Sequence, residues 1–189
     1  MTKIVLYPEK ILRKVLPRVV AVDEKLTNDM KNLSERLEGS ENGAGLAANQ
    51  IGSEKRMFGL KNGPNKKIDI FINPRITGVY GQKVYSKIVI DKGGEEDFLE
   101  GCLSFPNFYG TVKRFLKIEA EWEEAVKGKL VTKNGKLGGF EAIVWQHEAD
   151  HLDGILFVDH IKRDGGKFYK WVDKEKIEWN IDKVTEKEQ

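Results

Sequence analysis

The sequence predicts an α+β fold, a single compact domain of mostly antiparallel strands around a helix that carries the motif H-E-x-x-H. Two separated segments, residues 23–39 and 140–152, show the apolar spacing of helices. Between them lie short β-branched stretches bounded by Gly or Pro, which is the pattern of strands. No linker or repeat divides the chain, so we expect residues 1–189 to form one catalytic domain.

The first third of the chain predicts two helical segments. The stretch EKILRKVLP indicates a short helical turn that ends near Pro17. A clearer helix follows Asp23, because Leu26, Met30 and Leu33 recur at helical spacing. This helix ends in GSENGAG, which is too rich in Gly, Ser and Asn to continue it.

From about residue 55 to residue 131 the pattern is that of strands. The segments KKIDIFINP and QKVYSKIVI are short and rich in β-branched residues. In FLKIEAEWEEA, apolar and charged residues alternate strictly, which places Leu116, Ile118, Ala120 and Trp122 on one face of a strand. The dipeptide Asn134-Gly135 then predicts a hairpin turn.

The last part of the chain predicts a second helix and a hairpin. The helix should run from about Phe140 to Leu152 and end at Gly154. The stretch KFYKWVDKEKIEWNID favours a hairpin over a helix, and residues 182–189 are expected to form a frayed tail.

Composition excludes several classes of protein. The 32 basic and 30 acidic residues nearly balance, which gives no electrostatic reason to expect DNA as a partner. The single cysteine, Cys102, excludes an internal disulfide and fits a reducing compartment. The N-terminus has no apolar secretory region, and no stretch approaches the roughly 18 apolar residues of a membrane helix. We therefore expect a cytoplasmic protein with no membrane partner.

The segment HEADH indicates a metal site. Residues four apart lie on one face of a helix, so His147 and His151 can bind the same ion. Glu148 lies beside them, where its carboxylate could take a proton from water. The alternative is a merely polar helix surface. Because Phe140, Ile143 and Val144 form an apolar face leading to the imidazoles, a half-buried site is favoured.

A third ligand has several candidates. The metzincin pattern H-E-x-x-H-x-x-G-x-x-H fails at its last position, which is Phe157. Glu175 and Glu178 lie in the charge-dense hairpin, and His160 is more typical of a structural or surface histidine. A lone cysteine is usually a small buried residue, but Cys102 follows a glycine between strands, and a thiolate is a natural partner for two imidazoles.

Three motifs together resemble the peptide deformylases. GAGLAANQ covers residues 43–50, EGCLS covers residues 100–104, and HEADH covers residues 147–151. Flanking matches include INP, FP, Val112-x-Arg114 and GILFVDHI. The resemblance extends over roughly residues 5–162, and three motifs in order are highly specific.

The resemblance implies a mononuclear metal enzyme that removes the formyl group from the initiating methionine of new polypeptides. It implies Cys102, His147 and His151 as ligands of one divalent ion, usually Fe²⁺, with Zn²⁺, Ni²⁺ or Co²⁺ able to replace it. Glu148 would be the general acid and base. The Gln50 amide and the backbone N–H of Leu103 would stabilise the oxyanion.

The same resemblance suggests where an N-formylmethionyl peptide binds. An extended substrate is expected to pair with the small residues of GAGLAANQ as an added strand. The methionine side chain would enter a pocket lined by Phe140, Ile143 and Val144. For these three residues, packing in the core without contact to substrate is an equal alternative. The candidate substrate-binding residues are Gly43, Ala44, Gly45, Leu46, Glu100, Phe140, Ile143 and Val144.

Two departures from the family pattern bear on binding. Ala44 stands where the family usually has a larger aliphatic residue, which loosens that side of the pocket. The tail lacks an obvious long helix of the kind that docks some members on the ribosome, so the sequence does not decide whether the ribosome is a partner. The competing interpretations are an H-E-x-x-H metallopeptidase and a non-catalytic, ribosome-associated metal-binding module.

Overall fold

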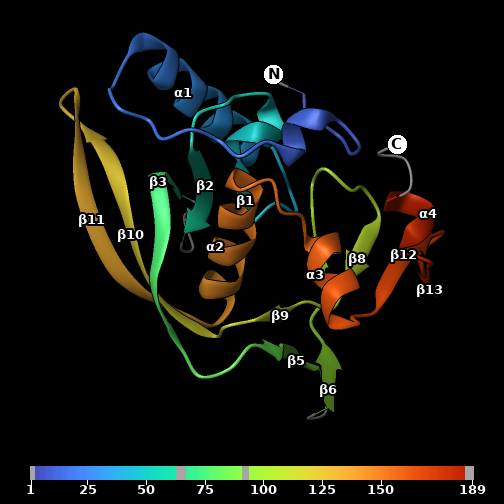
Figure 1. Cartoon of the computed structure of the whole chain (residues 1–189). Helices are drawn as coiled ribbons and strands as arrows, with labels where there is room; N and C mark the ends of the chain where they lie inside the picture. The colour runs from blue at the N-terminus through green and yellow to red at the C-terminus, as the bar shows by residue number, and fades with distance from the viewer. Residues whose placement is uncertain (1–2, 63–66, 91–93, 186–189) are drawn as a thin grey trace.

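The protein folds around two antiparallel sheets, as the computed structural model shows for residues 3–62, 67–90 and 94–185 (Figure 1). The larger sheet has the spatial order β1 (Gly45–Ala47), β2 (Met57–Asn62), β3 (Lys67–Tyr80), β10 (Lys117–Val126) and β11 (Lys129–Gly138). The smaller sheet has the order β13 (Glu175–Glu178), β12 (Phe168–Val172), β8 (Phe108–Gly110) and β7 (Glu100–Gly101). Two short pairs join β4 (Val84–Tyr85) to β9 (Lys113–Arg114), and β5 (Lys87–Ile90) to β6 (Gly94–Asp97).

Helices fill the space beside these sheets. They are the 3₁₀ helices η1 (Lys10–Arg13) and η2 (Ala48–Ile51), and the α-helices α1 (Glu24–Glu38), α2 (Gly139–Leu152), α3 (Phe157–Asp164) and α4 (Asp182–Thr185). Helix α2 is central in Figure 1, with the long strands β10 and β11 on one side and α3, β8 and β12 on the other. Both α1 and α2 pack against the larger sheet.

Helix α1 confirms the predicted amphipathic helix. The carboxylate of Asp23 accepts a hydrogen bond from the Leu26 backbone N–H at 2.6 Å and caps the first turn. Leu26, Leu33 and Leu37 are fully buried, because their spacing places them on the one face that meets β2 and β3.

The hairpin of β10 and β11 corrects the predicted turn at Asn134-Gly135. These two residues lie inside β11, where Gly135 pairs with Ala120. The chain instead turns at Lys127-Gly128, whose φ angles of 48° and 77° suit a two-residue hairpin turn. Asn-Gly is only a local signal, whereas the pairing register of the sheet decides where the strands end.

Other strand predictions are partly confirmed. Ile118 and Ala120 of β10 are buried as expected, whereas Leu116 precedes the strand and is exposed. Strand β3 continues beyond the predicted KKIDIFINP segment to Tyr80. The segment QKVYSKIVI divides into β4 and β5, which pair with different partners.

The C-terminal hairpin is confirmed, with β12 pairing on one side with β13 and on the other with β8. The tail differs from prediction, because residues 182–185 form the short helix α4. Trp179, Ile181 and Val184 pack against a buried cluster, and these contacts hold the segment in place. Residues 186–189, the rest of the predicted frayed tail, lie outside the described residues.

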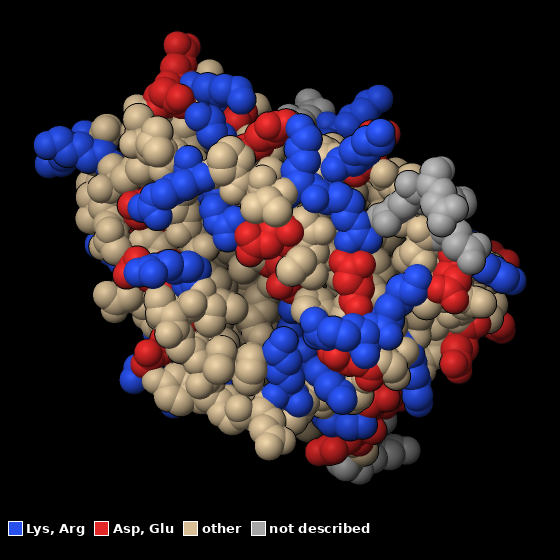
Figure 2. Space-filling model, viewed as in Figure 1, with Lys and Arg blue, Asp and Glu red and all other residues tan. Residues whose placement is uncertain are grey.

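Buried apolar side chains form two clusters. The larger lies between α1, α2 and the five-stranded sheet and includes Trp145 and Phe58. The smaller joins α3 to the four-stranded sheet through Phe157 and Phe168. Acidic and basic side chains are interspersed on the face seen in Figure 2. In the parts of the chain that the structure describes, no helix has the length and apolarity to cross a membrane.

Asn73 joins the N-terminal segment to the larger sheet. It adopts a φ of 50°, a conformation that Asn tolerates better than most residues. Its side chain accepts a hydrogen bond from the Val19 N–H and donates one to the Val19 carbonyl, both at 2.8 Å. A single buried amide therefore satisfies both backbone groups of Val19.

We predict that Asn73→Ala lowers the free energy of unfolding by about 2–4 kcal/mol, because two buried backbone groups lose their partners. Urea unfolding measures this change. The exposed Asn28→Ala on α1 is the control and should change stability by less than about 0.5 kcal/mol. Equal effects of the two substitutions would contradict the role assigned to Asn73.

Candidate metal centre and active-site pocket

Three side chains form a cluster that can bind a metal ion. His147 and His151 lie one turn apart on α2, and Cys102 directly follows β7. Their ligand atoms all lie within 4.8 Å of one another, with Cys102 Sγ 3.3 Å from His151 Nε2. Burial and the neighbouring His147 hold the pKa of His151 well below its usual value, which favours the neutral imidazole that metals bind. One thiolate and two imidazoles are suitable ligands for Fe²⁺ or Zn²⁺.

Strand β7 positions the thiol. Gly101, the residue before Cys102, pairs with Tyr109 of β8, and the tyrosine ring lies directly over it. A β-carbon at Gly101 would lie 2.6 Å from the ring, so only glycine permits this contact. The motif EGCLS therefore contains a glycine because β7 and a bulky residue on β8 approach closely.

Glu148 lies at the contact between α2 and β1. A β-carbon at Gly45 would lie 2.6 Å from the Glu148 Oε1 atom, so the carboxylate packs directly against the glycine backbone. Its other oxygen, Oε2, is buried without a hydrogen-bond partner among the described residues. Burial raises the pKa of Glu148 to about 7, although His147 opposes this rise. A carboxyl group with this pKa can exchange protons near neutral pH.

Gln50 is fixed beside the thiol by the turn of η2. Its side-chain oxygen accepts a hydrogen bond from the Ala47 N–H at 2.9 Å. Its Nε2 atom lies 3.2 Å from Ser104 Oγ and 3.3 Å from Cys102 Sγ. The amide donor thus points toward the metal-binding cluster, and its orientation is set by the backbone of the GAGLAANQ segment.

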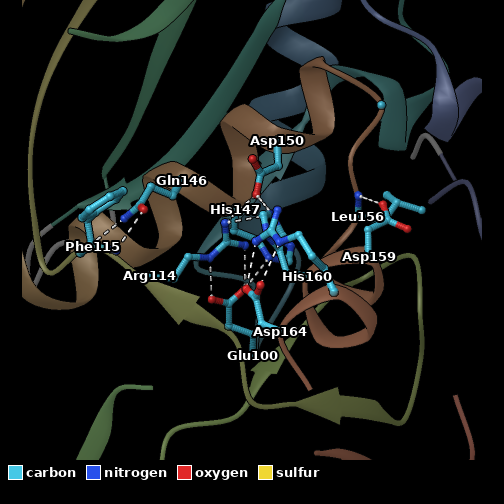
Figure 3. Close-up of polar contacts among 12 residues, drawn as sticks. Glu100, Arg114, Phe115, Gln146, His147, Asp150, Leu156, Asp159, His160 and Asp164 are labelled. Atoms are coloured by element: carbon cyan, nitrogen blue, oxygen red, sulfur yellow. Dashed lines mark hydrogen bonds and ion pairs between the residues drawn. The ribbon is translucent and has the colours of Figure 1, made fainter. Parts of the chain in front are cut away.

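A buried carboxylate orients His147. Glu100 Oε2 accepts a hydrogen bond from His147 Nδ1 at 3.0 Å, which leaves the other ring nitrogen available to a metal (Figure 3). Arg114 donates to both oxygens of Glu100, at 2.8 and 3.0 Å. Although burial opposes ionisation, Arg114 and His147 lower the pKa of Glu100 to about 2. The carboxylate predicted to contact substrate is therefore held by these two side chains.

Arg114 also connects this carboxylate to Asp150 and His160. A third guanidinium nitrogen of Arg114 donates to Asp150, which lies on α2 beside His151. Asp150 accepts a second hydrogen bond from His160 Nε2 at 2.7 Å (Figure 3). His160 is buried in this network on α3, which agrees with its expected structural role.

A cavity of about 430 Å³ lies over the cluster and is of the size typical of ligand sites. It collects nearly all of the residues selected from the sequence. Those that line it are Gly43, Ala44, Gly45, Gln50, Glu100, Cys102, Leu103, Phe140, Ile143, Val144, His147 and Glu148. Leu46 differs, because it is fully buried in the larger core and is not part of the lining. His151 is buried behind the cavity wall.

The cavity also has lining residues that sequence analysis missed. Phe98 and Leu99 contribute from the segment before β7, and Asn107 and Tyr109 contribute from β8 and its entry. Phe98 contacts Phe140 edge to face, with ring centroids 5.9 Å apart. These residues lie in segments with no distinctive pattern, so no sequence signal identified them.

The other candidates for a third ligand are not at the cluster. Glu175 and Glu178 are exposed on β13, which is the outer strand of the smaller sheet. His160 is engaged with Asp150 and Arg163. Among the described residues, Cys102, His147 and His151 are the group of suitable side chains that could bind a metal ion.

We predict that Arg114→Met destabilises the protein by about 3–5 kcal/mol, because the buried carboxylate of Glu100 and the partly buried carboxylate of Asp150 lose their cation. Urea unfolding at pH 7 measures the loss. The control is Arg75→Met, which removes an exposed pair with Glu121 and should cost less than about 1 kcal/mol.

The pH dependence of the free energy of unfolding provides a second test of the role assigned to Arg114. The pKa of Glu100 is lower in the folded protein than its ordinary value of 4.5, so the unfolded chain binds more protons. The resulting stabilisation is present above about pH 4.5 and is lost as the pH falls toward 2. In Arg114→Met the free energy of unfolding should fall less steeply between about pH 4.5 and pH 2 than in the parent protein. An unchanged dependence on pH would contradict the role assigned to Arg114.

Comparisons with known proteins show which family this chain resembles. A family model described as Polypeptide deformylase matches residues 1–166. Peptide deformylase 2 of Clostridium acetobutylicum is 37% identical over 151 residues, which cover 80% of this chain and 89% of that protein. A peptide deformylase of Helicobacter pylori strain G27 is 37% identical over 164 residues, which cover 84% of this chain and 85% of that protein.

A solved peptide deformylase structure has the same fold as this chain. The crystal structure of peptide deformylase from Thermotoga maritima matches with a TM-score of 0.69 and 30% identity, covering 85% of this chain and 97% of that chain. This similarity confirms the predicted α+β fold. With the family model matching most of its length, the chain belongs to the polypeptide deformylases, metal-dependent hydrolases that remove the N-formyl group from newly made polypeptides.

Proposed function

We propose that this chain removes the formyl group of N-terminal formylmethionine with the residues gathered at the cavity floor. The observation that carries the proposal is the position of Glu148, whose buried Oε2 has no hydrogen-bond partner among the described residues and which lines a cavity of about 430 Å³ together with Cys102 and His147 of the Cys-His-His cluster.

The metal would be held by Cys102 Sγ and by the imidazoles of His147 and His151, and we propose Fe²⁺ as the ion in the cell. A thiolate with two imidazoles supports iron, and Zn²⁺, Ni²⁺ or Co²⁺ would fit the same ligands. When bound, such an ion supplies Lewis acidity that makes water more acidic and polarises a carbonyl group. Glu100 would orient His147 for this role, since its carboxylate hydrogen-bonds the ring nitrogen Nδ1.

Glu148 would be the general acid and base. Its carboxyl group first takes a proton from the attacking water and then delivers a proton to the leaving amine. A pKa of about 7 supports both steps, because neither the protonated nor the ionised form is strongly favoured at neutral pH. Packing against Gly45 holds the carboxyl group next to the strand along which the substrate would lie.

Gln50 and the backbone N–H of Leu103 would stabilise the negative oxygen that forms on the formyl carbon. The Gln50 amide is anchored by Ala47 and Ser104, so its position requires little rearrangement during the reaction. Leu103 follows the metal-binding thiol directly and lines the same cavity. Donors placed in advance at a developing charge typically contribute about 10²–10³ in rate.

The peptide would bind as an added strand beside β1. Among the described residues this strand is at the edge of the larger sheet and pairs only with β2, while Gly43, Ala44 and Gly45 line the cavity. The methionine side chain would contact Phe140, Ile143 and Val144, and the small Ala44 leaves that wall open. Leu46 would act indirectly, by fixing β1 through its burial in the core.

The partners would be N-formylmethionyl nascent chains in the cytoplasm, where translation produces them. Attachment to the ribosome through a long C-terminal helix has no support in residues 167–185, where the last helix is the four-residue α4. A metallopeptidase activity is less well supported, because the site uses a cysteine ligand where H-E-x-x-H peptidases use a third His or Glu.

We predict that Glu148→Gln lowers the rate of formate release by about 10²–10⁴, because the amide cannot transfer the proton. The assay is formate release from formyl-Met-Ala-Ser by protein purified anaerobically with Fe²⁺. Glu141→Gln, at an exposed position on the same helix, is the control and should retain activity. The proposal fails if the parent protein releases no formate with Fe²⁺, Ni²⁺, Co²⁺ or Zn²⁺.

We predict that Cys102→Ser loses most of its bound metal, because a hydroxyl group is a much weaker ligand than a thiolate for these ions. Elemental analysis of the purified protein measures the metal content. Glu148→Gln retains all three ligands and should keep close to one ion per chain. Unchanged metal in Cys102→Ser would remove this residue from the ligand set.

A further inference from the structure

The outer face of the four-stranded sheet carries a row of aromatic side chains. Tyr109 of β8 pairs with Tyr169 of β12, and opposed residues of antiparallel strands point to the same face. Trp171 lies two residues beyond Tyr169 and therefore shares that face. We call Tyr109, Tyr169 and Trp171 the aromatic ledge. The opposite face of β12 packs on the smaller core through Phe168, which is buried there.

The aromatic ledge is continuous with the active-site cavity. Tyr109 lines the cavity and covers Gly101, the residue before Cys102. The Trp171 ring meets the Tyr109 ring edge to face, with centroids 6.4 Å apart. The Trp171 backbone N–H also donates to the carbonyl of Asn107, another lining residue, at 2.9 Å. The cavity wall and the hairpin of β12 and β13 thus form one connected surface.

Two of the three ledge residues belong to a part of the chain outside the family match. That match ends at residue 166, whereas the hairpin begins with Phe168. Trp171 is 40% exposed although it is the largest side chain on this face, whereas Tyr169 is half-buried and the Lys176 ammonium lies over its ring, 5.1 Å from the centroid. An exposed tryptophan beside a binding cavity is a suitable contact for an apolar ligand group.

We propose that the aromatic ledge binds the part of the substrate that follows the residues held in the cavity, favouring apolar side chains there. An extended chain advances about 3.3 Å per residue, so about two residues span the distance from Tyr109 to Trp171. A peptide that leaves the cavity past Tyr109 would meet Trp171 with its third or fourth residue. This inference rests on the proposed function, because it requires the cavity to hold a formylated N-terminus.

The test compares one short and one long substrate, formyl-Met-Ala and formyl-Met-Ala-Ala-Leu-Ala. In the parent protein kcat/KM should be higher for the long peptide, mainly through a lower KM. Trp171→Ala should reduce the ratio of the two kcat/KM values about 3- to 10-fold. Ile177→Ala is the matched control, because Ile177 lies on the same hairpin with 41% exposure but on the opposite face. Its ratio should equal that of the parent protein.

The outcomes separate this inference from the proposed function. No formate from formyl-Met-Ala by the parent protein would reject the function itself. Formate release with the same ratio in Trp171→Ala as in the parent protein would reject the ledge alone. An equal decrease of kcat/KM on both substrates would assign Trp171 a structural role and would also reject substrate binding by the aromatic ledge. Trp171→Phe keeps a ring and should restore most of the preference, which excludes unfolding as the cause. A parent protein that is dimeric, and becomes monomeric as Trp171→Ala, would place a second copy on the ledge and overturn the proposal.

Discussion

The buried guanidinium of Arg114 is the constraint on which the metal-binding end of the molecule depends. It is 2% exposed and interacts with the carboxylates of Glu100 and Asp150, so it joins β9 to β7 and to α2. His160 extends the network to α3. Charged groups buried this deeply are tolerated only when every partner is in place, so the strands and helices that supply them have little freedom to shift.

This constraint determines how the ligands meet. Glu100 lies two residues before Cys102, and Asp150 lies directly before His151, so both carboxylates held by Arg114 are adjacent or nearly adjacent to a metal-binding side chain. The third ligand, His147, is hydrogen-bonded to Glu100. One cation therefore restrains the backbone on both sides of the cluster. These contacts hold the ligand side chains close together, which reduces the conformational entropy that metal binding would otherwise cost.

The sequence predicted well the features that depend on neighbouring residues. The face of α1, the span of α2 and the C-terminal hairpin follow from local spacing, and the three motifs supply about half of the residues that line the cavity. The turn of the β10–β11 hairpin was wrong because Lys127-Gly128 and Asn134-Gly135 are both plausible locally, and only pairing with β3 and β10 decides between them. The role of Arg114 could not be inferred, because its partners are 14 and 36 residues away along the chain. Tyr109 and Trp171 come together through the register of β8 and β12, which leaves no trace in a single sequence.

The contact between Gly45 and Glu148 has a consequence for how this site can vary. The absent side chain at Gly45 leaves the space that the carboxylate occupies, so each position limits what the other can become. A larger residue in the edge strand would displace the carboxyl group, and a larger side chain at position 148 of the helix would press on the strand. The two positions should thus behave as an epistatic pair, in which the side chains tolerated at position 45 depend on the residue at position 148. Directed evolution of this pocket would then reach new substrates more readily through Ala44, which also lines the cavity, than through the glycine beside it.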